Sequence, residues 1–496
     1  MSQSVVVPDE LGEIITAVIE FYQDAVDKIE PKIVFLELRK NVVDWVSRTQ
    51  LKIEEKEIQA TGLTRQQQTA YKEMINFIEN SSEQYFRLSG YAGTGKSFLM
   101  AKVIEWLKQE DYKYSVAAPT NKAAKNLTQI ARSQGIKIEA TTVAKLLKLQ
   151  PTIDVDTGQQ SFEFNSEKEL ELKDYDVIII DEYSMLNKDN FRDLQQAVKG
   201  GESKFIFVGD SSQLPPVKEK EPIVANHPDI RKSANLTQIV RYDGEIVKVA
   251  ESIRRNPRWN HQTYPFETVA DGTIIKLNTE DWLQQALSHF EKEDWLSNPD
   301  YVRMITWRNK TADKYNQAIR EALYGENVEQ LVVGDRLIAK KPVFRSLPGG
   351  KKKEKKIILN NSEECKVIET PKINYNEKYK WEFYQVKVRT DEGGMIELRI
   401  LTSESEEKRQ KKLKELAKRA REEENYSEKK KQWAIYYELD ELFDNMAYAY
   451  ALTCHKAQGS SIDNVFLLVS DMHYCRDKTK MIYTGLTRAK KCCYVG

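Results

Sequence analysis

The sequence is poor in cysteine, and its few cysteines show no pattern typical of metal binding. Five cysteines occur among 496 residues, which is too few for a disulfide framework. No C-x-x-C pair is present, and no histidine stands at the spacing of a zinc site. We therefore expect neither disulfide bonds nor a structural zinc ion, and we expect a reducing, cytoplasmic setting. The cysteines are Cys365, Cys454, Cys475, Cys492 and Cys493.

Long apolar runs and net charge are also absent. No stretch of about 18 apolar residues occurs, so we expect no membrane-spanning helix. The opening residues MSQSVVVPDELGE lack a basic leader followed by an apolar core, so we expect no signal peptide. Lys plus Arg and Asp plus Glu each total 76, which gives a net charge of zero. This balance argues against a wholly basic surface for nucleic acid but leaves room for a local basic groove.

The sequence does contain an alternation of short apolar runs and helical stretches. Its length suggests roughly three or four domains, and its 40% apolar residues are enough to build sizeable cores. Residues 1–60 show helical spacing without a catalytic signature, which predicts a small helical accessory extension. Residues 61–240 predict parallel buried strands with helical crossovers, and 241–335 together with 446–496 predict a second unit of the same kind.

Two segments interrupt this α/β pattern. Extended pieces on either side of Asp156-Thr157-Gly158 predict a β-hairpin near residues 148–168. Residues 336–445 contain strand-like runs, the basic run KKKEKK and a stretch of mixed charge, which together predict an inserted β-rich domain. The mixed-charge stretch within 403–431 has only a thin apolar stripe, which favours a solvated helix packed lightly on one side.

A glycine-rich loop between a strand-like and a helical segment predicts a phosphate site. The sequence GYAGTGKS fits G-x-x-x-x-G-K-[ST] in the context that this motif requires. Backbone N–H groups of such a loop surround phosphate oxygens, and the following helix N-terminus adds positive potential. Lys96 would place a cation on the β- and γ-phosphates, and the Ser97 hydroxyl is a ligand for Mg²⁺. The predicted nucleotide-binding residues here are Gly90, Ala92, Gly93, Thr94, Gly95, Lys96 and Ser97.

An acidic pair ends an apolar strand, as an ATP-hydrolysing site requires. In DVIIIDE, Asp181 is predicted to hold Mg²⁺, mostly through water. Glu182 is predicted to orient and deprotonate the attacking water. A further apolar strand, KFIFVGD, is followed by Gln213. From its position alone, Gln213 could contact the γ-phosphate or be an ordinary loop residue.

The order of seven short motifs resembles that of the superfamily 1 helicases. The chain is most similar to the 5′→3′ branch that includes the Dda-like and RecD-like helicases, over roughly residues 61–496. The resemblance implies an α/β fold with two RecA-like P-loop motor domains, a β-hairpin insertion in the first motor and a β-barrel-like (SH3-like) plus helical insertion in the second. It also implies that ATP and Mg²⁺ bind between the motors. The motifs are GYAGTGKS, AAPTNKAAK, VIIIDEYSML, GDSSQLPPV, LTQIVR, YALTCHKAQGSS and YTGLTRAKK.

The resemblance implies roles for residues at the nucleotide. It implies that Gln67, in LTRQQQTAY, recognises adenine and that Gln213 senses the γ-phosphate. Arg241 and Arg488 resemble the two arginines that reach the γ-phosphate from the second motor, where a guanidinium stabilises transition-state charge. Gly459, together with Gln458, is implied to couple the DNA site to the nucleotide.

The resemblance also implies contacts to single-stranded DNA. The hairpin stands where this branch carries a strand-separating pin, whose aromatic residue could stack on a base, worth ~1–3 kcal/mol. The relatives usually carry a histidine where this chain has Ala144, so one expected contact is missing. The implied DNA-binding residues are Pro119, Thr120, Asn121, Phe162, Phe164, Asn309, Thr453, His455 and Lys456.

Together these expectations describe an ATP-dependent helicase that moves 5′→3′ on single-stranded DNA and unwinds forked duplex. The direction rests on the resemblance alone. Two alternatives stay open at this stage: a translocase that displaces bound proteins with little unwinding, and a nucleotide-gated interaction module. Replication or repair proteins could bind residues 1–60 or 403–431, and we expect no membrane partner.

Overall fold

The computed structural model describes residues 62–158, 160–163, 171–240, 245–256, 266, 268, 272–346, 355–391 and 393–496. By its internal contacts the chain divides into an N-terminal segment, Met1–Thr69, and the remainder, Ala70–Gly496, which contains both parallel sheets. The first unit and the second unit named below are the two parts of this remainder that are built around the first and the second parallel sheet. In the N-terminal segment the described part begins helix α3 (Arg65–Asn80). The Thr64 hydroxyl accepts a hydrogen bond from the Gln67 N–H at 3.3 Å, and the Gln67 side chain accepts one from the Thr64 N–H at 3.0 Å. This reciprocal cap explains why the helix starts there. The predicted extension 1–60 lies outside the described residues.

A six-stranded sheet carries the glycine-rich loop. Its order is β3–β2–β6–β7–β1–β8, and each neighbouring pair is parallel. All four residues of β6 are buried, as expected for a strand covered on both faces. The strands are β1 (Tyr85–Gly90), β2 (Tyr114–Ala118), β3 (Thr141–Thr142), β6 (Val177–Ile180), β7 (Lys204–Gly209) and β8 (Lys232–Leu236).

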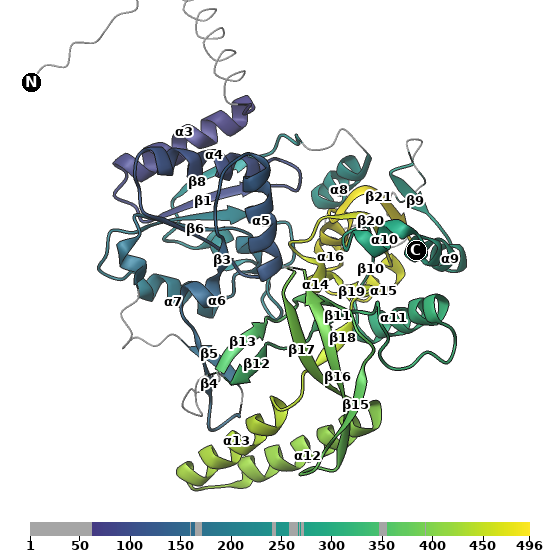
Figure 1. Cartoon of the computed structure of the whole chain (residues 1–496). Helices are drawn as coiled ribbons and strands as arrows, with labels where there is room; N and C mark the ends of the chain where they lie inside the picture. The colour runs from purple at the N-terminus through teal and green to yellow at the C-terminus, as the bar shows by residue number, and fades with distance from the viewer. Residues whose placement is uncertain are drawn as a thin grey trace, which may run out of the picture. The chain divides into compact units, whose positions relative to one another are not determined.

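Helices follow the strands of this sheet and lie on both of its faces (Figure 1). The Thr120 side chain begins α5 by accepting a backbone N–H bond from Ala123. At the start of β7, the Lys204 ammonium group donates to three carbonyl oxygens at the end of α3, those of Phe77, Ile78 and Ser81. Besides α3, the α-helices around this sheet are α4 (Lys96–Gln109), α5 (Asn121–Ser133), α6 (Val143–Leu146) and α7 (Lys188–Ala197).

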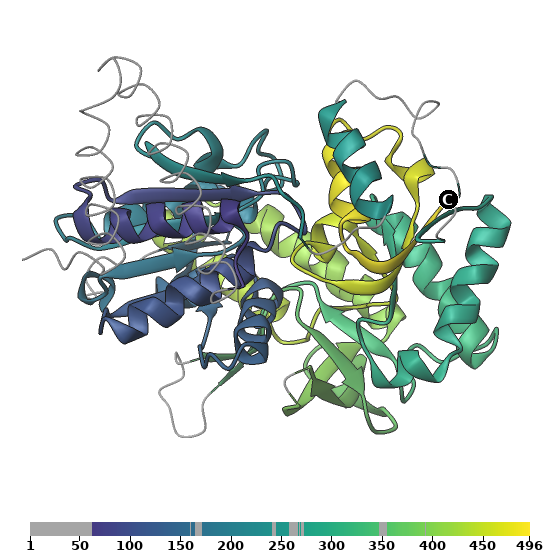
Figure 2. The same cartoon turned by 90° about the horizontal axis from the view of Figure 1, so that it is seen from above.

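A second parallel sheet lies beside the first in both views (Figures 1 and 2). Its order is β19–β10–β20–β21–β9. The predicted α/β fold with parallel sheets is therefore confirmed. The strands are β9 (Ile274–Lys276), β10 (Val302–Thr306), β19 (Ala451–Thr453), β20 (Ile462–Leu467) and β21 (Ala489–Val495). The helices are α8 (Glu245–Arg255), α9 (Thr279–Phe290), α10 (Glu293–Ser297), α11 (Asn309–Tyr324), α14 (Cys454–Ala457), α15 (Val469–Met472) and α16 (Lys478–Leu486).

An antiparallel sheet is inserted between β10 and β19. Its order is β15–β16–β14–β11–β18, with β17 also paired to β16, and β12 pairs with β13 in a separate ribbon. The strands are β11 (Arg336–Ala339), β12 (Val343–Ser346), β13 (Lys355–Leu359), β14 (Glu364–Val367), β15 (Lys372–Asn376), β16 (Trp381–Thr390), β17 (Met395–Leu401) and β18 (Met446–Tyr448). We expected the second parallel unit to resume at residue 446, but β18 still belongs to the inserted sheet. The buried strand β11 needs hydrogen-bonding partners on both edges, and β18 supplies the second.

Two helices complete the insertion, α12 (Ser403–Glu422) and α13 (Tyr426–Asp440). The thin apolar stripe of α12 is buried, because Leu413 and Leu416 pack in one cluster with Trp381 and Leu439. The mixed-charge stretch is therefore a helix buried along one side, as predicted, and its neighbour on that side is α13. Helix α13 was not expected from the sequence.

The β-hairpin within the first sheet's unit consists of β4 (Gln150–Ile153) and β5 (Gln160–Glu163), which pair antiparallel. Its turn lies next to α13, where the Tyr437 hydroxyl donates to the Gly158 carbonyl oxygen at 2.7 Å. Phe162 lies in β5, whereas Phe164 lies outside the described residues.

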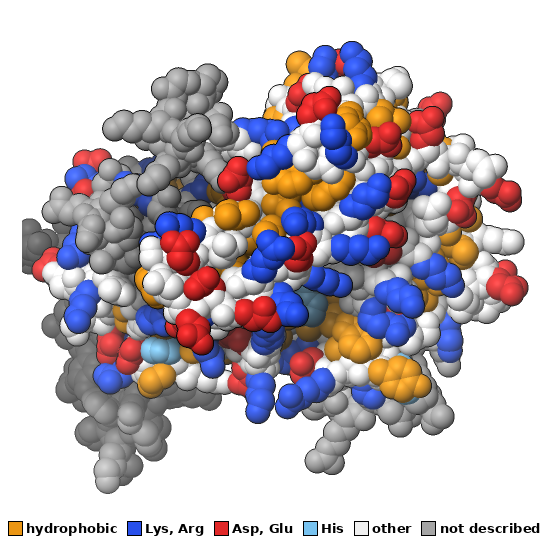
Figure 3. Space-filling model, turned by 90° about the horizontal axis from the view of Figure 1, so that it is seen from below, with side chains coloured by type: hydrophobic (Ala, Val, Ile, Leu, Met, Phe, Trp, Pro, Cys, Tyr) orange, Lys and Arg blue, Asp and Glu red, His pale blue; other side chains and the backbone are white. Residues whose placement is uncertain are grey.

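Charge is mixed on one face of the molecule. On the face shown in Figure 3, Lys and Arg side chains are interspersed with Asp and Glu side chains. Within the described ranges, none of the helices has the length and apolar character needed to cross a membrane.

Candidate nucleotide and DNA site

The glycine-rich loop is held in a shape that suits phosphate. Gly93 and Gly95 adopt left-handed φ angles of 82° and 78°, which glycine tolerates without strain. The Lys96 ammonium group donates to the carbonyl oxygens of Gly90 at 2.7 Å and Tyr91 at 3.0 Å. The predicted phosphate-binding lysine therefore lies over the loop, with the half-buried Ser97 next to it at the start of α4.

The acidic pair lies at the end of β6. Asp181 is buried, and burial together with the charge of Glu182 raises its pKa to about 7, although Lys96 opposes this shift. Glu182 has a φ of 53°, and among the described residues its buried Oε2 atom has no hydrogen-bonding partner. The buried Gln213 side chain lies in the turn that follows the neighbouring strand β7, and its Oε1 atom likewise has no partner in the part of the chain that the structure describes.

These buried polar atoms fit a site built for a charged ligand. An unpartnered buried oxygen costs about 1–3 kcal/mol, so its retention calls for a functional explanation. A triphosphate and a cation next to Lys96 and Asp181 would supply that explanation, because the cation would relieve the repulsion between Asp181 and Glu182. Among the described residues, no group of three or more His, Cys, Asp or Glu side chains could bind a metal without help.

The predicted arginine of the second unit follows α16. Arg488 is 5% exposed and donates to the carbonyl oxygens of Thr484 at 3.0 Å and Ser460 at 3.2 Å, and to the Thr487 hydroxyl at 3.2 Å. All three partners belong to the second sheet's unit. Arg241 lies outside the described residues.

The turn that carries Gln213 contacts the second unit through Leu214. The Leu214 N–H donates to the Thr484 hydroxyl at 3.1 Å, and its carbonyl oxygen accepts from the Gln458 side chain at 2.9 Å. The Leu214 side chain is buried in the hydrophobic core that the second sheet forms with its helices. Thr484 is also the partner of Arg488, so the helix end that carries the arginine touches the Gln213 turn.

The two predicted DNA-binding turns adjoin each other across the units. Thr120 and Asn121 begin α5 after β2, and Thr453, His455 and Lys456 lie where α14 follows β19. The side chain of Asn126, on α5, donates to the carbonyl oxygen of Gly459.

The predicted DNA-binding side chains differ in their surroundings. Burial lowers the pKa of both His455 and Lys456. The Asn121 side chain donates to a Glu363 carboxylate oxygen of the inserted sheet at 3.1 Å. Pro119, two residues before Asn121, is half-buried, whereas Asn309 is exposed at the start of α11.

Sequence reasoning missed residues that join the two units around the loop. Tyr483 contacts Ala92 and Asp210, and Arg254 contacts Tyr91. The only local signals were the acidic residue directly after the apolar strand KFIFVG and the tyrosine inside YTGLTRAKK.

The chain is similar in sequence to two family models and to several known proteins. A model described as an AAA domain matches residues 62–265, and one described as a UvrD-like helicase C-terminal domain matches residues 448–495. The chain is 26% identical over 449 residues to the ATP-dependent DNA helicase dda of Enterobacteria phage T4, covering 86% of this chain and 98% of that protein. It is equally similar, at 26% over 494 residues, to an uncharacterized protein of Acanthamoeba polyphaga mimivirus, with the same coverage of both chains.

Similarity to other proteins is more local or more remote. The ATP-dependent RecD2 DNA helicase of Deinococcus radiodurans is 31% identical over 176 residues, which are 35% of this chain and 22% of that protein. Among solved structures, Pif1 helicase from Bacteroides in complex with ADP-AlF3 and ssDNA aligns with a TM-score of 0.49 and 18% identity, covering 87% of this chain and 92% of that one.

Proposed function

We propose that this chain, a member of the Dda-like and RecD-like branch of the superfamily 1B helicases, is an ATP-dependent DNA helicase that moves 5′→3′ on single-stranded DNA and unwinds duplex ahead of it. One observation carries the proposal. The glycine-rich loop, the acidic pair and Gln213 lie at one edge of the first sheet, and the helix end with Arg488 touches the Gln213 turn.

Residues of the first unit would bind and activate the nucleotide. In this proposal the loop from Gly90 to Gly95 surrounds the phosphates with N–H groups, and Lys96 turns from the loop carbonyls to the phosphates. Ser97 and Asp181 are the residues that would hold Mg²⁺, which when bound would neutralise charge on the phosphate oxygens. Glu182 takes a proton from the attacking water.

Residues of both units would respond to the γ-phosphate. Gln213 hydrogen-bonds it from the first unit, and Arg241 and Arg488 stabilise its charge from the second. Arg488 must exchange its carbonyl partners for phosphate oxygens, so it favours a closed arrangement only when nucleotide is present. Leu214 and Gln458 would pass this change to the turn that holds His455.

Single-stranded DNA would cross the two adjoining turns. Thr120 and Asn121 from one unit and Thr453, His455 and Lys456 from the other would grip the strand in alternation, largely through phosphates. The inserted sheet would clamp the strand as an SH3-like domain, and the β4–β5 hairpin would separate the duplex. Both parallel sheets would then be RecA-like motors, with residues 1–60 or the charged helices open to protein partners in the cytoplasm.

The test uses matched duplexes with a 5′ or a 3′ single-stranded tail, with ATP hydrolysis followed in parallel. We expect hydrolysis to rise when single-stranded DNA is added and only the 5′-tailed duplex to open. Displacement of a bound protein without unwinding would instead support the translocase. Hydrolysis that does not respond to DNA would support a nucleotide-gated module.

A further inference from the structure

The hydroxyl group of Tyr483 joins two loops of the first unit from a helix of the second. It donates a hydrogen bond to Oδ2 of Asp210 at 2.7 Å and accepts one from the Ala92 N–H at 3.2 Å. Ala92 belongs to the glycine-rich loop, and Asp210 directly follows β7. A single side chain of α16 therefore reaches both the phosphate loop and the neighbouring strand end.

Asp210 shapes the turn that presents Gln213. Its carboxylate accepts a second hydrogen bond from the Ser212 N–H at 2.9 Å, and its carbonyl oxygen accepts from the Gln213 N–H at 3.2 Å. Asp210 is 1% exposed, and a buried carboxylate is costly unless donors surround it. Loss of the Tyr483 donor would therefore disturb the turn itself as well as a contact between units.

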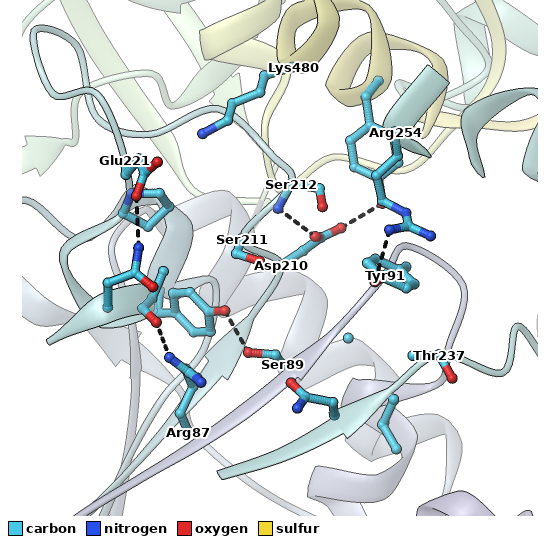
Figure 4. A pocket seen from close by; sticks show the side chains of 18 of the residues that line it. Arg87, Ser89, Tyr91, Asp210, Ser211, Ser212, Glu221, Thr237, Arg254 and Lys480 are labelled. Carbon is cyan, nitrogen blue, oxygen red and sulfur yellow. Dashed lines mark hydrogen bonds between the residues drawn. The ribbon is translucent and has the colours of Figure 1, made fainter. Parts of the chain in front are cut away.

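A second contact from the other unit reaches the adjacent loop residue. The Arg254 guanidinium lies 3.6 Å from the ring centroid of Tyr91 and donates to the Tyr91 hydroxyl at 2.9 Å. Figure 4 shows Arg254, Tyr91 and Asp210 lining one side of a cavity of about 700 Å³. Two consecutive residues of the phosphate loop are thus held by the second sheet's unit.

Tyr483 can act only as a neutral hydroxyl. Burial and the nearby Asp210 charge raise its pKa well above the ordinary value for tyrosine. The same helix end carries Thr484, which binds the Leu214 N–H and whose carbonyl oxygen binds Arg488. Any rotation of this helix end must therefore move the Tyr483 hydroxyl and Arg488 together.

We propose that Tyr483 is a positioning residue for ATP hydrolysis, whose hydroxyl keeps the phosphate loop and the Gln213 turn in register with the helix end that carries Arg488. This inference rests on the proposed function. In this proposal, Tyr483 transmits the relative movement of the two motors to the loop that would hold the phosphates.

The test compares Tyr483→Phe with Tyr183→Phe in the full chain. Tyr183 is a matched control, because its buried hydroxyl faces the same cavity but bonds Ser89 within the first unit at 2.8 Å. In Tyr483→Phe we expect kcat of DNA-stimulated hydrolysis to fall by about 10- to 100-fold, as for loss of one hydrogen bond to a buried charge. We expect KM for ATP to change less than about threefold, so the loss falls on kcat rather than on nucleotide binding.

A double-mutant cycle with Asp210→Asn isolates the hydrogen bond, and the Asp210→Asn variant alone tests the contact if Tyr483→Phe proves unstable in thermal unfolding. If both act through one contact, the double variant should be no slower than the slower single variant. The inference is overturned if Tyr483→Phe and Tyr183→Phe have the same kcat, or if the two changes are additive. Absence of hydrolysis in the unmodified protein would instead overturn the proposed function.

Discussion

The indole N–H of Trp433 donates a hydrogen bond to the carbonyl oxygen of Val155 at 2.9 Å. Trp433 belongs to α13 of the insertion, whereas Val155 lies in the turn between β4 and β5. Val155 and Trp433 are buried together with Ala420 in one small cluster. The turn of the hairpin therefore packs on the helix pair rather than standing free.

Substitution of Gly158 tests whether this packing matters for unwinding. Gly158 has a φ of 69°, and a Cβ there would lie 2.0 Å from two ring atoms of Trp433. Gly135 is a matched control, since its φ is 76° and nothing lies within 4 Å of an added Cβ. We expect Gly158→Ala to reduce unwinding several-fold more than DNA-stimulated hydrolysis, and Gly135→Ala to show only the backbone cost of about 1 kcal/mol in stability. Equal losses of unwinding and hydrolysis in Gly158→Ala would contradict a role for hairpin docking in strand separation.

Replacement of Lys96 with Ala removes the only cation that the phosphate loop sequence provides. We expect ATP hydrolysis to fall by about 100-fold or more, because electrostatic stabilisation is usually the largest catalytic contribution. Lys102→Ala on the same helix is the control, since Lys102 lies outside the loop and pairs with the partly exposed Glu105. Steady-state ATPase assays measure both, and retained turnover in Lys96→Ala would defeat the phosphate-site assignment.

Glu182→Gln should separate binding from hydrolysis. The amide keeps the size of the side chain but cannot accept the proton of the attacking water, so we expect hydrolysis to fall by about 100-fold or more. Nucleotide binding, followed by isothermal titration, should remain within a few-fold of the unmodified protein. Asp189→Asn, an exposed carboxylate on α7, is the control. A loss of binding would mean that Glu182 contacts nucleotide rather than water.

Glu363 binds the side chain of Asn121, which is predicted to contact DNA, and also pairs with the nearby Lys125. Its carboxylate accepts from Asn121 at 3.1 Å and pairs with Lys125 at 3.5 Å. We expect Glu363→Gln to raise affinity for single-stranded DNA at low salt by about threefold or more, because the carboxylate no longer competes with phosphate. Fluorescence anisotropy across a salt series measures this, with the exposed Glu369→Gln, normally paired with Lys387, as the control. A lower affinity would show that Glu363 orients Asn121 for DNA.

The acid stability of the molecule should depend on Glu364. Burial would raise the pKa of this carboxyl, but Arg303, Lys122 and Arg336 outweigh burial and lower it to about 2. Its contribution to the free energy of unfolding is therefore complete above the unfolded pKa of about 4.3 and is lost as pH falls through about 2.

Urea denaturation between pH 5 and pH 2, a window of about three units set by these two pKa values, checks this expectation. Glu364→Gln should cost about 3–5 kcal/mol near neutral pH, since it leaves the fully buried Arg303 without its charge partner. The variant should also show a shallower loss of stability with acid. The same pH slope in both proteins would contradict the assignment of that titration to Glu364.

Local sequence was enough to predict that the glycine-rich loop lies between a strand and a helix and that the acidic pair follows a buried strand. Each depends on a few consecutive residues, because the strand, the turn and the helix that form the site adjoin in the chain. The parallel α/β pattern was predictable for the same reason, as β6 and β7 are continuous apolar runs.

The contacts that join the units could not be predicted in this way. Tyr483 and Asp210 are separated by 273 residues, and Trp433 and Val155 by 278. No hydrophobic periodicity in the sequence relates the two residues of such a pair. They become neighbours only when the whole chain folds. The pairing of β18 with β11 depends likewise on an open strand edge that is created far away in the chain.

Leu214 has a consequence for any attempt to divide the protein. It follows the last residues of β7, yet it fills a place in the hydrophobic core of the second sheet. If fragments were produced separately on either side of residue 240, each would expose apolar surface. The first fragment would expose the Leu214 side chain, and the second would expose the core residues that this side chain normally covers. We expect such fragments to aggregate alone and to reassemble by complementation when they are refolded together.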